Sequence, residues 1–189
     1  MRTSMRLFSL TYKSLKTLYP EKNPSPVFRH SLKVFQIVKK LSEKLDVNKK
    51  VLYPGALLHD IGRMAEIIHP IQHAVEGEKI ILQSEIFDLM DNETRIKVSK
   101  ICRNHIGCGI TAKDIENQKL PLPVTDYIPE TTEELLVSFA DNICCGDKIS
   151  GINSAVTRFS QELGEEYGQR ILNQCEQLNA LGLDLSFLY

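Results

Sequence analysis

The sequence predicts an all-α protein, and three observations support this prediction. Apolar residues recur at spacings of three and four along most of the chain, as they do on one face of a helix. Alternation of apolar and polar residues, the mark of a half-buried strand, nowhere extends beyond a few positions. Capping residues, glycines and prolines separate the apolar segments. We therefore expect a helical bundle around one core, for which 189 residues suffice.

The first predicted helices lie on either side of a proline-containing linker. Residues 4–18 are expected to form a short amphipathic helix. After the linker, Ser25 has the properties of an N-cap and Pro26 those of a first-turn residue. The helix that they open is expected to run to about residue 45, with His30 on its apolar stripe.

The next two helices enclose the pair His59-Asp60. One is expected over about 48–60 and ends in this pair, although Pro54 leaves its start or a kink open. Residues 63–69 form a connection, and the following helix is expected over about 71–83.

The second half of the chain is predicted to continue as helices. Asp91 or Asn92 caps a helix that runs to about His105, and the glycines after it end that helix. Residues 111–130 contain three prolines and are expected to form a surface loop. Thr131 or Thr132 opens a helix that carries Asp141 near its middle. The last two helices are expected over about 151–163 and 165–181.

Composition limits the classes of partner and the compartment. The net charge of -1 gives no strong electrostatic signal for nucleic acid or for an anionic membrane. Five cysteines without a C-x-x-C motif do not form the framework of a secreted disulfide scaffold. A signal peptide is not expected, and no apolar run approaches the length of a membrane span. These features favour a cytoplasmic protein, and they leave its oligomeric state open.

The histidines indicate a metal site. Four of the five occupy apolar faces or helix ends in separate predicted helices, and Asp141 lies among apolar residues, where a carboxylate needs a partner. A lone histidine on such a face is usually a hydrogen-bonded core residue, but the ordered set favours metal binding. This mixture of ligands suits zinc, iron, manganese or cobalt better than calcium. Ligands from several helices would converge in a bundle core.

The order His30, His59-Asp60, Asp141 resembles the HD superfamily of metal-dependent phosphohydrolases, and His59-Asp60-Ile61-Gly62 is similar to its HDIG variant. The segments around His73 and Asn104-His105 resemble the subgroup with additional histidines, which binds two metals. Within this subgroup the spacing is most similar to HD proteins that hydrolyse diadenosine tetraphosphate. The strings NHIGCGIT, LPLPVTDYIPETTEE and FADN resemble an uncharacterised HDIG family common in archaea. The Gly-Tyr-Pro signature of the cyclic-dinucleotide branch is missing, which disfavours that branch.

The resemblance covers about residues 26–150 and implies a single HD domain over 1–189, with helical extensions at both ends. It implies one or two divalent ions, with Fe, Mn, Zn, Co and Ni not distinguishable. The implied metal ligands are His30, His59, Asp60, His73, His105 and Asp141, and Asp60 bridges the two ions. The implied catalytic residues are Asp60, Arg63 and His69. The implied reaction is hydrolysis of a phosphate ester or anhydride of a nucleotide by a metal-activated water.

Several alternatives stay open. The chain could instead be a single-metal phosphatase similar to 5′-nucleotidases, or a non-catalytic, metal-stabilised module that binds a nucleotide or a protein. Arg63 could bind phosphate or merely complement a helix dipole. His69 could face the substrate or be a loop residue before Pro70. We interpret Cys144-Cys145 as small core residues rather than ligands.

Overall fold

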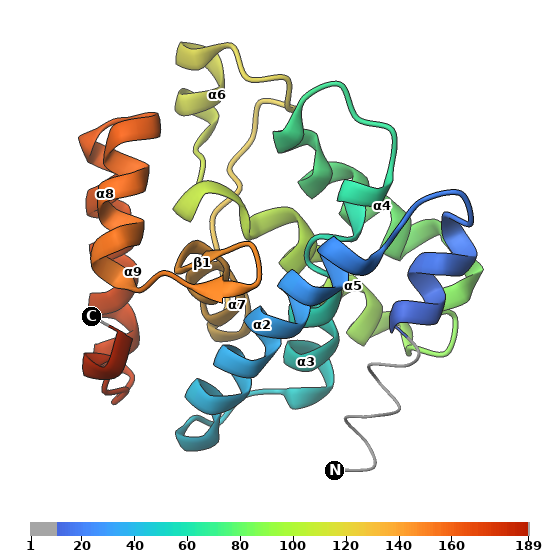
Figure 1. Ribbon diagram of the computed structural model, residues 1–189, viewed down its shortest axis with the longest axis horizontal. Coiled ribbons are helices and arrows are strands. Elements are labelled where there is room, and N and C mark those ends of the chain that lie inside the picture. The colour runs from blue at the N-terminus through green and yellow to red at the C-terminus, as the bar shows by residue number, and fades with distance from the viewer. Residues whose placement is uncertain (1–10, 189) are drawn as a thin grey trace.

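Helices make up nearly all the regular structure of residues 11–188, the part of the chain that the computed structural model describes (Figure 1). The all-α prediction is confirmed. Of the helix expected over 4–18, residues 11–18 are helical, and the remainder lies outside the described residues. The other helices are α2 Ser25–Leu41, α3 Lys49–Leu58, α4 His73–Gln83, α5 Asn92–Asn104, α6 Ala112–Gln118, α7 Thr132–Asn142, α8 Ile152–Leu163 and α9 Glu165–Ala180.

Short 3₁₀ turns and one small hairpin join these helices. The turns that bear on the site are η2 Ile61–Met64, η3 Pro70–Gln72 and η5 Ile106–Cys108. Further turns lie at η1 Ser42–Lys44, η4 Glu85–Phe87 and η6 Ser186–Leu188. The strands β1 Cys144–Cys145 and β2 Lys148–Ile149 pair antiparallel directly after α7. Two-residue strands are too short to leave an alternating pattern in the sequence.

Side-chain caps explain where several helices begin. Asn48 caps α3 by accepting a hydrogen bond from the Lys50 amide at 3.1 Å. The sequence left two candidates for the N-cap of α5 and two for that of α7. The structure shows Asp91 as the N-cap of α5 and Thr131 as that of α7. The prediction that Ser25 is the N-cap of α2 is wrong, because Pro24 holds that position and Ser25 is already helical. The Ser25 amide instead donates to the Asn23 side chain at 3.0 Å.

The prediction of a loop over 111–130 is wrong in its first part, because this segment contains α6. Thr111 Oγ1 accepts from the Asp114 amide at 3.1 Å, and Asp114 Oδ2 accepts from the Thr111 amide at 2.8 Å. This reciprocal pair is a capping box. The sequence does contain the signal for this helix, since Thr111 is followed three residues later by an acidic residue. The three prolines further along the segment favoured a loop instead.

The buried apolar side chains form two clusters that hold the site between them. The larger cluster draws on α2, α3, α5, α7 and α9, and these helices pack around the centre of the molecule. The smaller cluster fixes α6 and the segment after it against α4 and η5; its members are Ala74, Ile106, Ile110, Ile115, Leu122 and Tyr127. Helices α8 and α9 pack on one another at the side of the bundle (Figure 1). None of the described helices is long and apolar enough to cross a membrane.

Candidate metal centre

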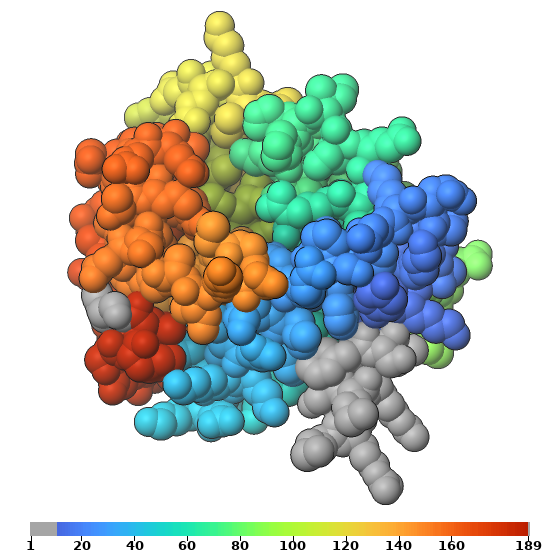
Figure 2. All heavy atoms as spheres, viewed as in Figure 1, coloured from blue at the N-terminus to red at the C-terminus, as the bar shows by residue number. Residues whose placement is uncertain are grey.

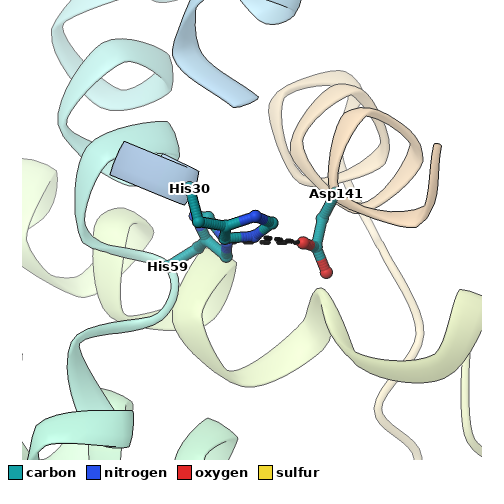
Figure 3. A group of neighbouring side chains, drawn as sticks. All are labelled: His30, His59 and Asp141. Carbon is teal, nitrogen blue, oxygen red and sulfur yellow. Dashed lines mark hydrogen bonds and ion pairs between the residues drawn. The ribbon is translucent and has the colours of Figure 1, made fainter. Parts of the chain in front are cut away.

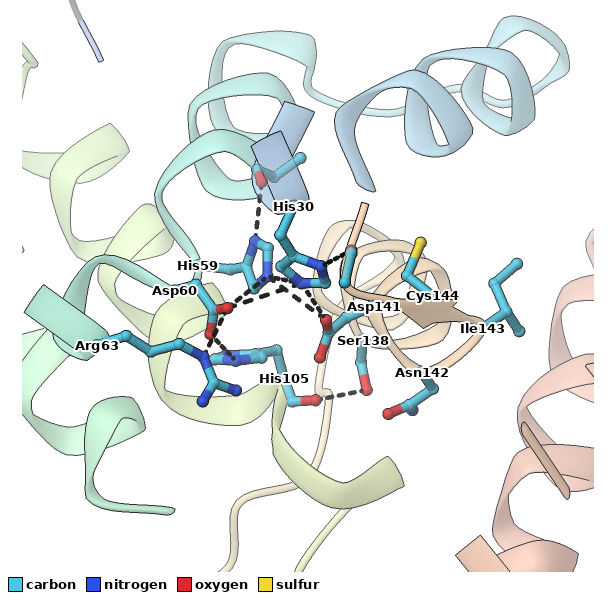
Figure 4. Close-up of polar contacts among 12 residues, drawn as sticks. His30, His59, Asp60, Arg63, His105, Ser138, Asp141, Asn142, Ile143 and Cys144 are labelled. Atoms are coloured by element: carbon cyan, nitrogen blue, oxygen red, sulfur yellow. Dashed lines mark hydrogen bonds and ion pairs between the residues drawn. The ribbon is translucent and has the colours of Figure 1, made fainter. Parts of the chain in front are cut away.

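Six side chains with metal-binding chemistry meet where α2, α3, α4, α5 and α7 converge. His30 comes from α2, His59 and Asp60 from the end of α3, His73 from the start of α4, His105 from the end of α5, and Asp141 from α7. Figure 4 shows five of them, all except His73, pointing toward a common centre together with Arg63. The structure thus brings together all six residues for which the sequence predicted metal binding.

The end of α3 is the reason that adjacent residues reach the same centre. His59 still has helical torsion angles, with φ -50° and ψ -37°. Asp60 leaves the helix, with φ -97° and ψ 11°. The change of backbone direction lets both side chains face the buried interior, and both are at most 2% exposed. On a continuous helix, neighbouring side chains would diverge by about 100°.

The imidazole rings of the four histidines in this centre are all oriented in the same way, by a hydrogen bond between Nδ1 and a backbone carbonyl. Three use the carbonyl three residues earlier: His59 with Ala56 at 2.9 Å, His73 with Pro70 at 2.6 Å, and His105 with Cys102 at 2.8 Å. His30 uses Gly146 in the hairpin after α7, at 2.6 Å. With the proton on Nδ1, the Nε2 atom of a neutral ring carries the lone pair that a metal needs.

The first cluster consists of His30, His59 and Asp141, which come from three helices and point toward one another (Figure 3). Asp141 Oδ1 lies 2.7 Å from His30 Nε2 and 3.6 Å from His59 Nε2. The two Nε2 atoms are 3.3 Å apart. Burial would lower the pKa of His30, but Asp141 outweighs this effect and raises it to about 9. The carboxylate therefore favours a positive charge at this position.

The second cluster joins His73 and His105 to Asp60. The Nε2 atoms of the two histidines are 3.0 Å apart, and they lie 3.1 and 3.5 Å from Asp60 Oδ1. Burial lowers the pKa of His105 to about 4, so its ring is neutral at pH 7. A neutral His105 ring whose Nδ1 carries the proton presents the lone pair of its Nε2 atom to this cluster, where a cation would be bound favourably.

Asp60 lies between the two clusters and divides its oxygens between them. Its Oδ2 atom is 3.7 Å from His30 Nε2 and 3.8 Å from His59 Nε2. Its Oδ1 atom faces His73 and His105 but is buried without a hydrogen bond of acceptable geometry. Burial alone would raise the pKa of Asp60, but the neighbouring His59, His105 and His73, together with Arg63, hold it well below the ordinary range. The carboxylate is therefore charged, and its Oδ1 atom has two imidazole nitrogens beside it but makes no hydrogen bond.

Each of the two clusters has ligand chemistry that suits a divalent transition-metal ion. Four imidazole nitrogens and two carboxylates match the ligand preference of zinc, iron, manganese, cobalt and nickel. A cation in the second cluster would satisfy the orphaned Asp60 oxygen, and one in the first would take the place of the proton that Asp141 favours. The single carboxylate between two sets of nitrogen ligands suits a bridging role.

Gly62 explains how α4 approaches close enough to supply His73. A Cβ atom added at Gly62 would lie 2.0 Å from the His73 carbonyl oxygen and 2.6 Å from the Gly77 amide nitrogen. Both contacts are with backbone, which cannot rotate away. The glycine of the His-Asp-Ile-Gly stretch therefore permits the crossing of η2 and α4, and this crossing holds Asp60 and His73 at contact distance.

Arg63 and His69, the other two predicted site residues, lie at the edge of the centre. Arg63 Nε is 2.7 Å from Asp60 Oδ2, and the Arg63 side chain is 41% exposed. His69 is exposed, and its Nδ1 atom accepts a hydrogen bond from the Ile71 amide at 3.3 Å, as a cap of η3. Both residues line the cavity above the centre. Their catalytic roles stay predictions.

A cavity of about 760 Å³ opens above the centre and is lined by all the ligand candidates except His59, which is fully buried. Figure 2 shows the recess between α8 in orange, α6 in yellow and the green residues that lead into α4. The far wall includes Phe159 and Leu163 of α8, Tyr167 of α9 and Gln118 of α6. Sequence reasoning missed this wall, because these residues have no motif and are far from the histidines in the chain.

The hairpin after α7 also borders the cavity. Cys144 is buried, as predicted, but Cys145 is exposed, so the interpretation of both as core residues is wrong for Cys145. Its position in a two-residue strand turns alternate side chains to opposite faces. The Gly146 carbonyl, which orients His30, is a second feature of this hairpin that sequence reasoning missed.

Comparison with known proteins agrees with this geometry. The model of the HD domain matches residues 27–144. An uncharacterized protein of Methanocaldococcus jannaschii is 34% identical over 138 residues, which cover 72% of this chain and 75% of that protein. No solved structure matches.

Two further relatives carry the name tRNA (cytidine(56)-2′-O)-methyltransferase. The protein of Picrophilus torridus is 32% identical over 90% of this chain, and that of Thermoplasma volcanium is 33% identical over 83%. This chain spans only 47% and 43% of their respective lengths. The match to the domain model includes His30, His59, Asp60, His73, His105 and Asp141, and it extends over more than half of the sequence. The chain belongs to the HD domain family.

Proposed function

We propose that this protein is a metal-dependent phosphohydrolase that acts on a phosphate ester or anhydride of a nucleotide. The observation that carries the proposal is the position of Asp60, a buried carboxylate with one oxygen toward each pair of histidines. The histidines that surround it are already oriented by backbone carbonyls. This centre forms one end of a cavity that is large enough for a nucleotide-sized ligand.

We assign the metal-binding role to His30, His59, Asp60, His73, His105 and Asp141. Divalent ions held by these residues would supply Lewis-acid chemistry, which polarises phosphoryl oxygens and lowers the pKa of water. Burial of Asp60, which is 2% exposed, strengthens its hold on cations.

Arg63 is proposed to bind a phosphoryl oxygen of the substrate. Its Nε atom pairs with Asp60, so its terminal nitrogens stand outside this ion pair at the border of the cavity. A guanidinium in this place complements negative charge that grows on the phosphoryl oxygens in the transition state. His69 is proposed to contact the substrate from the rim, through the Nε2 atom that its capping bond leaves unused.

The experiment measures bound metal and phosphate release together. The purified protein is loaded with Mn²⁺, Fe²⁺, Zn²⁺, Co²⁺ or Ni²⁺ and assayed on nucleoside mono-, di- and triphosphates and on diadenosine tetraphosphate. Asp141→Asn should lose metal and most of the activity, whereas Glu43→Gln, an exposed carboxylate away from the cavity, should retain both. If the fully loaded protein releases phosphate from none of these compounds, the enzyme proposal fails.

A second candidate function follows from the name that two relatives carry. The region similar to this chain makes up less than half of each relative. For this protein we therefore consider binding of tRNA and not methyl transfer. The test is a titration with unmodified tRNA at 50 and 200 mM salt. Specific association should persist against a single-stranded DNA competitor, and failure to bind tRNA would eliminate this candidate.

A further inference from the structure

The cavity extends well beyond the metal centre and changes character along its length. Its polar end is formed by the ligand candidates and Arg63. Val27, Ile71 and Ile106 line the cavity beside the segments that carry the ligands, and its far wall includes the apolar side chains Leu120, Phe159 and Leu163. A water molecule takes about 30 Å³, so the volume of about 760 Å³ far exceeds what a phosphate group requires. The apolar end is therefore available to another part of the substrate.

The outer wall is contributed by α8, which lies after the residues that match the HD domain model. Arg158, Phe159, Glu162 and Leu163 line the cavity, and their spacing puts them on one stripe of the helix. The buried residues Ile152 and Ala155 belong to the same stripe and lie nearer the start of α8, where the helix packs against the core. This face of the helix is thus used for packing near its start and for the cavity toward its end.

Arg158 fixes this wall to the metal centre. Its guanidinium donates to the Asn142 carbonyl at 2.7 Å and to the Cys144 carbonyl at 3.1 Å. These carbonyls flank the end of α7, directly after Asp141. The same guanidinium lies 5.0 Å from the centroid of the Phe159 ring. The aromatic ring is therefore held in a defined position relative to the residues proposed to hold the metal.

Two polar side chains interrupt the apolar end. Tyr167 is 1% exposed, and its hydroxyl accepts a hydrogen bond from Gln118 Nε2 at 2.7 Å. A phenolic hydroxyl can also donate, and the Gln118 side chain retains an acceptor oxygen and a second N–H. An aromatic ring with a nearby set of donors and acceptors matches a flat, aromatic ligand with polar edges, such as a nucleobase.

We propose that α8 forms a base-binding subsite, in which a nucleobase stacks on Phe159 while the Gln118–Tyr167 pair contacts its edge. The substrate would then be a nucleotide whose phosphate lies at the metal centre and whose base lies at the α8 wall. This inference rests on the proposed function for the phosphate end only. Phe159 is the specificity-determining residue.

The experiment compares two substrates that share the same kind of phosphate ester. The first is the best of the four common nucleoside 5′-monophosphates, and the second is ribose 5-phosphate, which lacks a base. Phe159→Ala should raise KM for the nucleotide roughly 10-fold or more, the scale of a lost base–aromatic contact. Its kinetics with ribose 5-phosphate should stay within twofold of the wild type. Phe159→Trp should retain most of the preference.

A binding measurement makes the test independent of catalysis. The corresponding nucleoside, which has no phosphate, is titrated by calorimetry into the wild type, Phe159→Ala and Gln161→Ala. Gln161 is exposed on α8 but does not line this cavity, so its variant should bind like the wild type. Equal melting temperatures of the three proteins would establish that all are folded.

The outcomes separate this inference from the proposed function. Nucleoside binding that depends on Phe159, without hydrolysis of any phosphate compound, supports the subsite and overturns the phosphohydrolase. Hydrolysis with equal preference for nucleotide and ribose 5-phosphate, unchanged in Phe159→Ala, overturns the subsite and leaves the phosphohydrolase standing.

Discussion

Asp60 has a different neighbourhood on each of its two oxygens, and this distinguishes it from the other ligand candidates. Oδ2 faces His30, His59 and Arg63, and Oδ1 faces His73 and His105. His105 and Asp141, in contrast, each lie mainly in one cluster. Because of this asymmetry, we expect replacement of Asp60 to change the metal content differently from replacement of His105.

The first prediction concerns metal stoichiometry. Wild-type protein should bind about two ions, His105→Ala about one and Asp60→Ala close to none, because a bridging carboxylate serves both ions. Elemental analysis after loading and desalting measures this directly, with Glu43→Gln as the control. Saturation of the wild type at one ion would favour the single-metal alternative. A full complement in Asp60→Ala would contradict the bridging role.

The second prediction concerns Arg63. Its pairing with Asp60 at 2.7 Å and its border position lead us to expect that Arg63→Ala lowers kcat roughly 100-fold, the scale of one lost electrostatic contact in a transition state. Arg63→Lys should recover part of the loss, since a point charge replaces the guanidinium fork. Metal content is measured in the same samples. If the fall in bound metal accounts for the whole loss of activity, then Arg63 acts by stabilising Asp60 and not by contacting the substrate.

At the scale of the elements, the centre depends on helix ends and crossings more than on helix faces. His59 and His105 lie at C-termini, and His73 lies at an N-terminus. The i−3 carbonyls that these three histidines contact come from the adjoining helical turns. The geometry of the site is therefore sensitive to any shift of α4 relative to η2.

The third prediction tests this crossing. Gly62→Ala should lower the free energy of unfolding by about 3 kcal/mol, because a Cβ atom would overlap the backbone of α4. In the protein that still folds, the ion next to His73 should be lost before the ion next to His30. Gly77→Ala is the matched control in the same crossing, since its Cβ would meet Cys102 at 3.3 Å. Urea unfolding and elemental analysis make the comparison. Equal stability of the two variants would contradict the role of Gly62.

At the scale of the whole molecule, α9 ties α6 to the bundle through one ion pair. Arg170 donates to both oxygens of Asp114, at 2.7 and 3.0 Å, and it also donates to the Gly109 carbonyl. Asp114 in turn caps α6, which carries Gln118 to Tyr167. This contact therefore positions part of the cavity wall across more than fifty residues of sequence.

The fourth prediction follows from the charge of Asp114. Burial would raise its pKa, but Arg170 and Thr111 lower it to about 2. The unfolded chain, with the ordinary value of about 3.9, takes up a proton first as the pH falls. The ionised carboxylate should therefore stabilise the fold at pH 5–7 by about 1–2 kcal/mol relative to Asp114→Asn, after allowance for solvent screening. This advantage should disappear between about pH 4 and 2.

Urea unfolding of wild type and Asp114→Asn at several pH values measures this difference. Arg170→Met is a second variant that removes the same ion pair from the other side. An advantage of the wild type that stays constant down to pH 2.5 would contradict the assignment.

The sequence by itself determined the class of the fold and the family. Helical periodicity and caps such as Asn48 and Asp91 are local properties, because they depend on residues only a few positions apart. The order of His30, His59-Asp60 and Asp141 indicated the family, which the match to the HD domain over 27–144 confirms. The single-domain organisation over 1–189 and the roles of the site residues remain predictions.

Only the tertiary structure decided how these residues are used. It gave Asp60 two different neighbourhoods, and it set Gly62 against the backbone of α4. It also brought Phe159 to the cavity that begins at the histidines. Each of these relations joins segments that are distant in sequence through packing or through a backbone carbonyl. A carbonyl is present in every residue, so no local pattern reveals which one will orient a given side chain.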